Sequence, residues 1–562
     1  MGMTFWIECL VTLVVVFIAT DWFLTSVVFS FKRDLNPIAL KEQASISTVR
    51  KEKETAHYRN YLVPHGFPLT TGLNLAIGYR HRNGNFADIW STAMELAKNN
   101  SIKFTNYDRE YSLPQINGMA NQILNMHLAN NYKQIGITVS TSTLEGFTIS
   151  IAAMIGSIKN DLIPHFLSSV PRQKIENVDV LVVNSWNSLK LLNGSESWYK
   201  LIIVCESSAE RPANLNIDFD VKSWDELIDS YVEQPEFKYT SPEDKSDDMK
   251  PFLQVTSPWN DTTSFTQMSI VSSVAAFVRS FPMDKEIQPK DTLMVVGSLA
   301  DASSSVQIWN KMLGTLLFGA SLSFTTKYSV TMDQPTMLVI SKEDTLEILK
   351  KTIKYADNSF FSRIKLSWST TLLSEGILTN FAMLNTSESS ATLKNLRVVY
   401  VVSSIVNAEV ASSLTGKIQK RKSMSSTSIT TRDMNILRAQ LGCRAVSELY
   451  CPFLVMGPLS ETHYFDYRVL PPSVDTTVSM NGTLATTLEG KLVDTEENPD
   501  LDVKSRQGMI CIRGFSIGRP VEQERLDKAL KLCENYGGGE GWMPLIGVYG
   551  LWGNDGCLYV YK

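Results

Sequence analysis

Cysteine and histidine are both scarce in this chain, which has seven cysteines and six histidines among 562 residues. The cysteines form no C-x-x-C pair, and neither residue type recurs at the spacing of metal ligands, which excludes the common zinc motifs. An odd number of scattered cysteines cannot close entirely into disulfides and is typical of a protein in a reducing compartment. No metal site is therefore predicted.

An excess of positive charge is also missing. The chain has 53 Lys and Arg against 58 Asp and Glu, a formal net charge of −5. This balance removes the usual electrostatic reason for expecting nucleic-acid binding, so no nucleic-acid partner is predicted. Its 30 Gly and 21 Pro are ordinary amounts and exclude a collagen-like or largely disordered chain. The length predicts several structural units.

One long hydrophobic run stands near the N-terminus. Residues 9–31 read CLVTLVVVFIATDWFLTSVVFSF, with one charged residue, Asp21. As a helix this run would be ~35 Å long, enough for a hydrocarbon core of ~30 Å. A central Asp costs about 3 kcal/mol, less than the Leu, Ile, Val and Phe side chains return at about 0.3–0.6 kcal/mol each. A cleaved signal peptide is less favoured, because no Lys or Arg precedes the run and no A-x-A-like site ends it.

We therefore predict a membrane anchor over residues 1–34. Its marker residues, within the run and at its basic end, are Leu10, Val14, Phe17, Asp21, Phe23, Val27, Lys32 and Arg33. Because basic residues follow the run and none precedes it, the rest of the chain is predicted on the cytosolic side. The expected membrane is the endoplasmic reticulum, with the lipid-droplet surface as the alternative. Asp21 is either a functional intramembrane group, the mark of a half-inserted anchor, or a tolerated charge.

Five N-x-S/T sequons leave the opposite topology open, because they matter only in a lumenal domain. They lie at Asn99, Asn193, Asn260, Asn385 and Asn481.

The rest of the chain alternates helix and strand patterns. Helices are expected at 86–99, 112–128 and 143–158, and buried strands at 135–140, 178–183, 201–205, 291–297, 337–340 and 398–402. This alternation predicts an α/β fold built on mostly parallel sheet. Short strands at 508–513 and 558–561, among turn residues, indicate a smaller β-rich subdomain.

The expected units are a membrane anchor, a linker with lead-in, an α/β body and a small β-rich subdomain. Their bounds are 1–34, 35–80, 81–480 and 481–562. The charged part of the linker is 41–59, and solvated loops are predicted at 241–250 and 412–432, the second of which is a candidate for phosphorylation.

Short landmarks follow one another in a fixed order over residues 80–562. They are the helix at 86–99, Y-S-L at 111–113, F-L-Q-V-T-S at 252–257, L-L-F-G-A-S at 316–321, Q-P-T at 334–336, L-R-V at 396–398, G-W at 541–542 and D-G-C-L-Y at 555–559. This order resembles the adenylate-forming superfamily of acyl-CoA synthetases, luciferases and peptide-synthetase adenylation domains. The resemblance implies that family's large domain, with layered mixed and parallel sheets, helices and a small β-rich subdomain.

The family's phosphate-binding loop, T-S-G-T-T-G-x-P-K-G, corresponds to the segment that begins at residue 256. The sequence there is Thr256, Ser257, Pro258, Trp259, Asn260, Asp261, Thr262 and Thr263. Pro258 removes an N–H group, Trp259 fills the space that glycine leaves open, and Asp261 has the wrong charge for a phosphate. The next Lys is Lys285. The resemblance thus implies a degenerate loop.

Two further family positions are altered. The motif Y-G-x-T-E, which supplies an aromatic wall and a magnesium-linked Glu, corresponds to Tyr450 and, at the Glu position, Leu454. An alternative alignment keeps Glu461 but loses the Tyr-Gly pair. The motif G-W-x-x-T-G-D, whose Asp binds ribose, reaches Gly547 here without an acidic residue.

The chain ends at Lys562, where the family's hinge would begin. The resemblance therefore implies that the small closing domain and its catalytic Lys are absent.

Together these departures predict a pseudoenzyme with no catalytic residue, cofactor or metal. The predicted role is a membrane-anchored scaffold or regulator, in lipid metabolism, that contacts the lipid bilayer and protein partners of unknown identity. Two alternatives stay open: a sensor that keeps an acyl or CoA pocket, and a residual acyl-CoA ligase.

Overall fold

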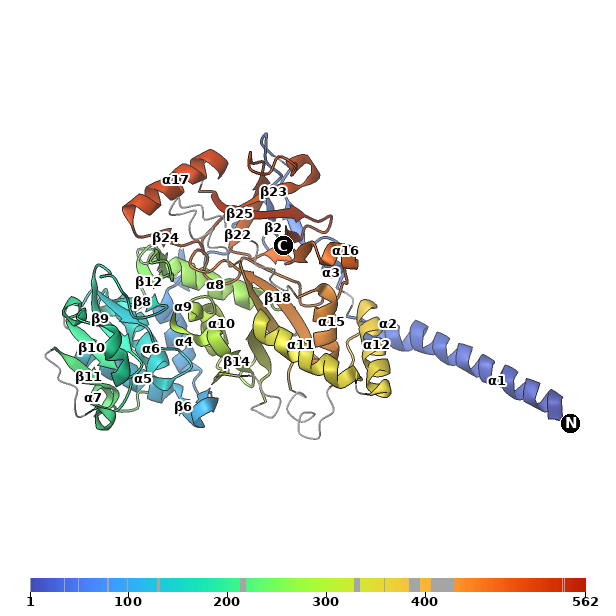
Figure 1. The fold of residues 1–562 in the computed structure, drawn as a ribbon, viewed down its shortest axis with the longest axis horizontal. Helices are drawn as coiled ribbons and strands as arrows, with labels where there is room; N and C mark the ends of the chain where they lie inside the picture. Colours follow the sequence, from blue (N-terminus) through green and yellow to red (C-terminus); the bar gives the residue numbers. More distant parts are fainter. Residues whose placement is uncertain are drawn as a thin grey trace.

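Three large sheets and one small one make up the part of the chain that the computed structural model describes (Figure 1). The described residues are 2–34, 36–48, 50–77, 80–98, 100–128, 132–212, 219–327, 334–357, 359–383, 395–405, 429–537, 539 and 541–561. The sheets form one body, and a single long N-terminal helix projects from it.

The first sheet has eight strands in the order β11-β10-β9-β7-β8-β12-β13-β24. Their bounds are β7 Gln134–Ile137, β8 Ile163–Leu167, β9 Val178–Val183, β10 Leu201–Val204, β11 Val221–Ser223, β12 Pro251–Thr256, β13 Thr262–Thr266 and β24 Arg519–Pro520. Strands β7 to β12 pair in parallel, whereas β13 and β24 pair antiparallel at one edge. The continuous apolar runs of β9 and β10 follow from burial on both faces of the sheet.

The second sheet has nine strands in the order β21-β19-β18-β17-β16-β14-β15-β5-β6. Their bounds are β5 Ser101–Phe104, β6 Arg109–Ser112, β14 Thr292–Val296, β15 Ser321–Thr325, β16 Met337–Ser341, β17 Val398–Ser404, β18 Arg444–Tyr450, β19 Ser460–Glu461 and β21 Thr483–Leu484. The central strands are parallel. Both large sheets thus confirm the predicted α/β class.

The two large sheets share one hydrophobic core with the helices α4 Phe86–Glu95, α5 Leu113–Gln122, α6 Leu144–Lys159, α8 Gln267–Arg279 and α10 Trp309–Leu316. Asn85, Ser112 and Thr143 cap α4, α5 and α6. These caps confirm the predicted helix starts, because a side-chain oxygen there accepts an otherwise unpaired backbone N–H. A π-helical turn, Ile123–Leu128, extends α5.

The remaining described elements surround this core. They are α3 Pro37–Leu40, α7 Trp224–Ile228, α9 Ala302–Ser305, α11 Lys342–Asp357, α12 Phe360–Ser374, α15 Thr431–Leu441, α16 Pro472–Asp475, α17 Gln523–Gly537, and the hairpin β3 Leu75–Ile77 with β4 Arg80–Arg82. Most of the predicted loop at 412–432 lies outside the described residues, and its last two residues begin α15.

The third sheet has seven antiparallel strands in the order β1-β2-β22-β23-β25-β26-β20. Their bounds are β1 Ala44–Ile46, β2 Tyr58–Asn60, β20 Val478–Met480, β22 Leu488–Val493, β23 Gln507–Gly514, β25 Met543–Trp552 and β26 Leu558–Tyr561. The charged linker predicted at 41–59 is therefore wrong, since β1 and β2 belong to this sheet. Tyr58 stacks on Trp552 with ring centroids 4.2 Å apart, which binds the early strands to the C-terminal ones.

The loop at 241–250 is largely exposed, as predicted, with two exceptions. Asp247 and Asp248 are buried, because Arg82 pairs with Asp247 at 2.6 Å and the Asn83 amide donates to Asp248 at 2.5 Å. Both partners flank the end of β4, far away in sequence, so the sequence pattern alone could not reveal them.

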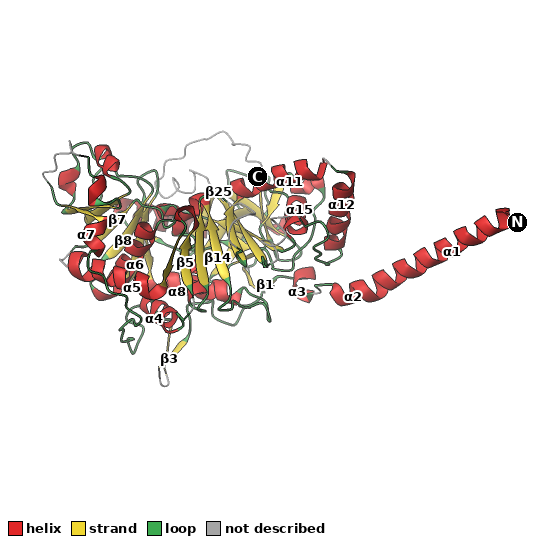
Figure 2. Cartoon of the chain, turned by 90° about the horizontal axis from the view of Figure 1, so that it is seen from below, coloured by secondary structure: helices red, strands yellow, loops and turns green. Residues whose placement is uncertain are grey.

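A continuous helical segment projects from the body (Figure 2). It consists of α1 Gly2–Phe23, a π-helical stretch Leu24–Val28 and α2 Phe29–Lys32. The helix Phe5–Lys32 is long and apolar enough to cross a membrane, and its most hydrophobic window has a mean hydropathy of 2.1. Its most hydrophobic window buries 0% of its residues within the protein. This helix is a candidate membrane span at the predicted place.

Candidate functional site

The loop between β12 and β13 occupies the place of the expected phosphate-binding loop. It is a closed turn, in which the Ser257 N–H donates to the Asp261 carbonyl at 2.9 Å and the Asn260 N–H to the Ser257 carbonyl at 3.0 Å. The Ser257 hydroxyl accepts the N–H groups of Trp259 and Asp261, both at 3.3 Å. Pro258 has no N–H to give.

In residues 257–261, all of which the structure describes, every backbone N–H group therefore donates to an acceptor within the loop itself. A phosphate-binding loop works by presenting such groups to the anion. The next N–H, that of Thr262, donates to the Glu522 carboxylate at 2.9 Å. In this conformation the loop does not fit the phosphates of a nucleotide.

A buried hydrogen-bond chain fixes both ends of the loop. The Thr256 and Thr262 hydroxyls are 2.9 Å apart, and the Thr256 hydroxyl lies 2.6 Å from His165 Nε2. His165 Nδ1 lies 3.0 Å from Gln134 Oε1. Burial lowers the pKa of the His165 imidazole to about 3, so the ring is neutral at physiological pH. The loop thus begins and ends on a rigid support.

Asp261 faces a cation of the protein itself. Its carboxylate lies 3.5 Å from Arg525 Nε, and Arg525 also donates to the Thr262 carbonyl at 2.7 Å. Because Arg525 belongs to α17, the negative charge of Asp261, which is unfavourable for a phosphate, holds that helix against the loop.

A cavity of about 490 Å³ opens beside the loop, at the carboxyl ends of β8 and β12. Residues 256–260 line one side of it and residues 167–173 the other. The Asn260 amide reaches across and donates to Gln173 Oε1 at 3.0 Å. Trp259 is half-exposed and Arg172 is exposed, so an aromatic ring and a cation stand at the cavity. Ligands of open α/β sheets commonly bind at this edge.

Tyr450 and Leu454 are both buried, so neither offers its side chain to a ligand at the surface. The Tyr450 hydroxyl donates to Glu448 at 3.0 Å. Leu454 is 3% exposed and packs in a core with Val455 and Leu459, where a carboxylate would be desolvated.

The structure brings this segment close to the loop. The Gly518 N–H donates to the Leu454 carbonyl at 2.7 Å, and two residues later β24 pairs with β13. The altered loop and the altered Tyr-x-x-x-Leu segment are therefore linked through residues 518–520.

A buried charge cluster beside Tyr450 escaped the sequence interpretation. Lys311 Nζ lies 2.7 Å from Glu448 Oε1, and both side chains are 0% exposed. The ammonium also lies 4.8 Å from the Phe277 ring centroid and 4.7 Å from that of Tyr400, in cation–π geometry. The signal that could have revealed it is the single charge of Lys311 within the largely apolar run 308–320.

Glu461, the alternative candidate for the family's Glu, lies on β19 directly opposite Glu448. Burial and the Glu448 carboxylate raise the pKa of Glu461, against the opposing effect of Lys311. The family's carboxylate position and this buried cluster are thus adjacent.

Gly547 lies in β25 of the third sheet, with a positive φ of 77°. The Trp542 indole that precedes it is 1% exposed. Lys491 and Arg513 each lie 4.6 Å from its ring centroid, and the His57 ring is 4.8 Å away. The G-W landmark is therefore a packing element of the sheet.

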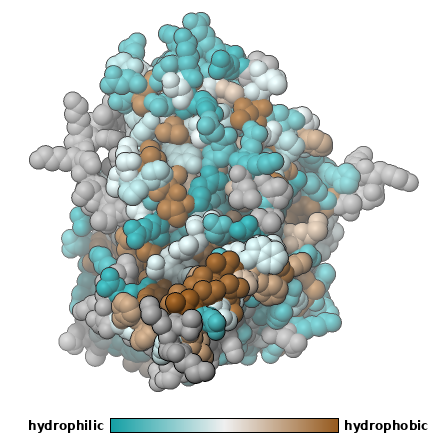
Figure 3. Space-filling view, turned by 90° about the vertical axis from the view of Figure 1, so that its right-hand side faces the viewer, coloured by the Kyte–Doolittle hydropathy of each residue, from teal (hydrophilic) through white to brown (hydrophobic). Residues whose placement is uncertain are grey.

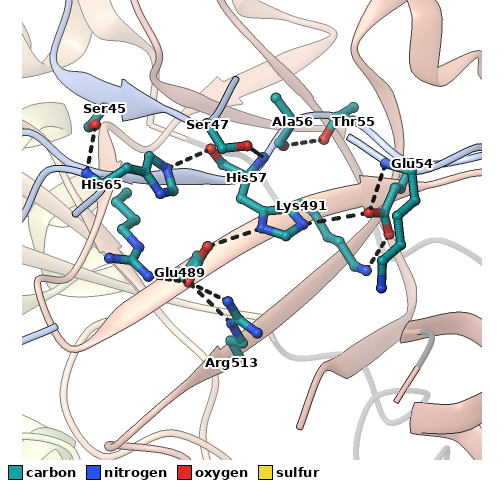
Figure 4. Close-up of polar contacts among 12 residues, drawn as sticks. Ser45, Ser47, Glu54, Thr55, Ala56, His57, His65, Glu489, Lys491 and Arg513 are labelled. Atoms are coloured by element: carbon teal, nitrogen blue, oxygen red, sulfur yellow. Dashed lines mark hydrogen bonds and ion pairs between the residues drawn. The ribbon is translucent and has the colours of Figure 1, made fainter. Parts of the chain in front are cut away.

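Figure 4 shows the polar cluster to which His57, Lys491 and Arg513 belong. His57 lies between Glu54, at 3.5 Å, and Glu489, at 3.2 Å, and Glu54 also pairs with Lys491. Burial would raise the pKa of Glu489, but its hydrogen bonds with His57 and Arg59 and the nearby guanidinium groups lower it to about 2. The cluster links the N-terminal strands to β22.

No known protein-family profile matches the sequence. The uncharacterized protein YHR045W of Saccharomyces cerevisiae is 48% identical over 567 residues, covering 100% of both chains.

Solved structures with a similar fold are much more distant in sequence. The luciferase-like enzyme of the mealworm Zophobas morio is 12% identical, with 88% of this chain and 98% of that chain covered and a TM-score of 0.53. The N-terminal domain of FACL13 from Mycobacterium tuberculosis is 10% identical, with 85% and 100% covered and a TM-score of 0.50. NpsA of Klebsiella oxytoca is 13% identical, with 85% and 79% covered and a TM-score of 0.50. The chain has the fold of adenylate-forming enzymes and belongs to the family of the yeast protein YHR045W.

Proposed function

We propose that the protein is a catalytically inactive relative of adenylate-forming enzymes that is anchored in a membrane and acts as a scaffold or regulator, in lipid metabolism, through protein partners. One observation carries the proposal: the N–H groups of residues 257–261 are already hydrogen-bonded within the loop. Opening that turn to receive a nucleotide would cost several hydrogen bonds at once.

Other positions support the loss of adenylation. Leu454 is packed in a hydrophobic core, and Asp261 carries negative charge into the loop and is paired with Arg525. Electrostatic stabilisation of phosphates is a large part of phosphoryl and adenylyl chemistry, and these residues do not supply it.

The membrane part of the proposal rests on the helix Phe5–Lys32 and on the cations at its inner end. Lys32 and Arg33 lie at the end of the helix, and basic residues tend to stay on the cytosolic side, which supports a cytosolic body. The endoplasmic reticulum is the membrane we propose, with the lipid-droplet surface as the second location.

The direct test is an assay of the purified full chain for ATP-dependent release of AMP with fatty acids of several chain lengths, with and without CoA. We expect no release above a blank, while an active acyl-CoA synthetase in the same detergent serves as the positive control. AMP release, or tight binding of ATP·Mg²⁺ in a calorimetric titration, would instead support a residual ligase. Proximity labelling in cells would identify the partners and the membrane.

A second candidate function is a ligand sensor, favoured by the cavity of about 490 Å³ beside the loop. Mass spectrometry of small molecules that co-purify with the full chain separates the two functions. A bound acyl or CoA compound that Trp259→Ala displaces supports the sensor, and an empty cavity in a protein with bound partners supports the scaffold.

A further inference from the structure

Helix α12 has a hydrophobic stripe on its solvent-facing side. Phe360, Phe361, Ile364 and Trp368 are 73%, 74%, 48% and 54% exposed. Their spacing places them on one face of the helix, which carries three aromatic rings. Large exposed apolar side chains that gather on one face mark an interaction site rather than ordinary surface.

The opposite side of α12 is already used for packing. Ser369 and Leu373 are buried, and Leu373 belongs to a core with Ala439 and Tyr467. The exposed stripe is therefore additional to the face that holds the helix on the body.

Cations border the stripe. Arg363 and Lys365 lie on its two flanks by helical position. Lys365 Nζ lies 5.6 Å from the centroid of the Phe381 ring, which is itself 52% exposed. A helix with aromatic and aliphatic residues on its outer face and basic residues at the borders is typical of the lipid headgroup interface.

The helix that carries the stripe ends where the N-terminal helix meets the body. Arg33 pairs with Glu375 at 3.0 Å, and the Asp34 N–H donates to the Gly376 carbonyl at 2.8 Å. Both acceptors directly follow α12. Figures 1 and 2 show α12 beside α2 at the end of the body from which α1 projects, and Figure 3, which views this end, shows hydrophobic patches among polar residues.

We infer that α12 lies in the headgroup layer of the membrane that the N-terminal helix spans, with its aromatic stripe among the lipids. The inference rests on the membrane attachment proposed above. A lipid surface is the favoured occupant, because the helix that carries the stripe ends at the base of the anchor and the flanking cations match anionic headgroups. Such a helix buries its apolar face ~5–10 Å into the interface.

The test uses the full chain reconstituted in phosphatidylcholine vesicles, with and without phosphatidylserine. A genetically encoded fluorescent amino acid replaces Ile364, and a matched chain carries it in place of Leu191, which is 68% exposed and follows β9 at the opposite end of the body (Figure 1). Lipids with a quencher in the upper acyl chain are expected to quench the probe at 364 severalfold more than the probe at 191. Phosphatidylserine is expected to increase that difference. Phe361→Ser with Trp368→Ser in the chain labelled at 364 should remove it.

Attachment is measured separately, as resistance of the chain to alkaline extraction from the same vesicles. A chain that resists extraction but whose probe at 364 is quenched no better than that at 191 overturns the role of α12 and leaves the anchor in place. A chain that is extracted overturns the anchor itself. Shielding of the probe at 364 from both lipid quencher and aqueous iodide would show that a second copy covers α12, which also overturns the inference.

Discussion

Asp34 and Arg444 are separated by 410 residues in the chain and form an ion pair of 2.8 Å. The Tyr467 hydroxyl donates to the same carboxylate oxygen at 2.6 Å. Because Asp34 comes two residues after α2 ends, these contacts join the N-terminal helix directly to the core beneath β18 and α15. Burial raises the pKa of Tyr467, so the hydroxyl remains a donor at physiological pH.

Replacing Asp34 tests this joint, by which we mean the contacts of Asp34 with Arg444 and Tyr467. Asp34→Ala leaves the half-buried Arg444 without its partner, and we expect the free energy of unfolding to fall by about 1–3 kcal/mol. Glu375→Ala, which removes the more exposed partner of Arg33, should cost only about 0–1 kcal/mol. Denaturant unfolding of the full chain in detergent measures both, and equal losses would contradict the joint.

The buried pair of Lys311 and Glu448 gives a second prediction. Lys311→Met strands a carboxylate in the core and should lower the free energy of unfolding by about 3–5 kcal/mol. The double variant Lys311→Met with Glu448→Gln should be more stable than Lys311→Met alone, because no unpaired charge remains. A double-mutant cycle with additive losses would show that the two side chains do not depend on each other.

The lowered pKa of Glu489 predicts that the protein loses stability in acid. Its pKa of about 2 in the folded chain lies below that of an unfolded Glu, so the unfolded chain binds more protons as the pH falls. The stabilisation, about 3 kcal/mol, should be complete above the unfolded pKa of about 4.3 and disappear as the pH falls towards about 2. Glu489→Gln should flatten this pH dependence.

The matched control is Glu524→Gln. The Glu524 side chain is 82% exposed and pairs with Lys528 on the surface of α17, so its replacement should leave the acid limb of the stability curve unchanged. An unchanged curve in Glu489→Gln would mean that the cluster around Trp542 does not hold a charged carboxylate.

Replacing Ser257 tests whether the loop is closed by its hydroxyl. Its hydroxyl accepts two backbone N–H groups, so Ser257→Ala should lower the free energy of unfolding by about 1–3 kcal/mol. Ser257→Thr keeps the hydroxyl and is expected to retain most of the stability. If Ser257→Ala is as stable as the parent chain, the hydrogen bonds from the loop's N–H groups to the Ser257 hydroxyl do not stabilise the protein.

Introducing charged residues into the N-terminal helix tests the anchor. Val14→Arg with Phe17→Arg adds about 2.5–3.5 kcal/mol per residue to the cost of insertion, more than the helix can offset. The variant should move to the soluble fraction after alkaline extraction of membranes. Val14→Leu with Phe17→Leu should remain in the membrane fraction, and a double Arg variant that also remains would refute insertion.

The features that the sequence revealed are local. The helix starts predicted at 86, 112 and 143 lie within one residue of those of α4, α5 and α6, and strands such as β10 and β16 are largely apolar runs. The order of weak landmarks was sufficient for the fold, because it depends on the whole chain and not on any single residue.

The features that it concealed depend on distant partners. Residues 51–54 read as a charged linker, yet Glu54 is buried against Lys491 of β22, more than 400 residues away in the chain. Lys311 meets Glu448 only through packing of α10 on β18. Pro258 and Asp261 indicated a degenerate phosphate loop. The acceptors of the loop's backbone N–H groups, however, could not be predicted from the sequence.

The short joint at Asp34 has a consequence for access to the cavity. Because only Arg33 separates the end of α2 from Asp34, the body has little freedom to rotate relative to the N-terminal helix. The cavity beside β8 and β12 lies towards the opposite end of the body from α12 (Figure 1). With the helix in a bilayer, that cavity would lie far from the lipid, so the molecules that reach it would be solutes from the aqueous phase.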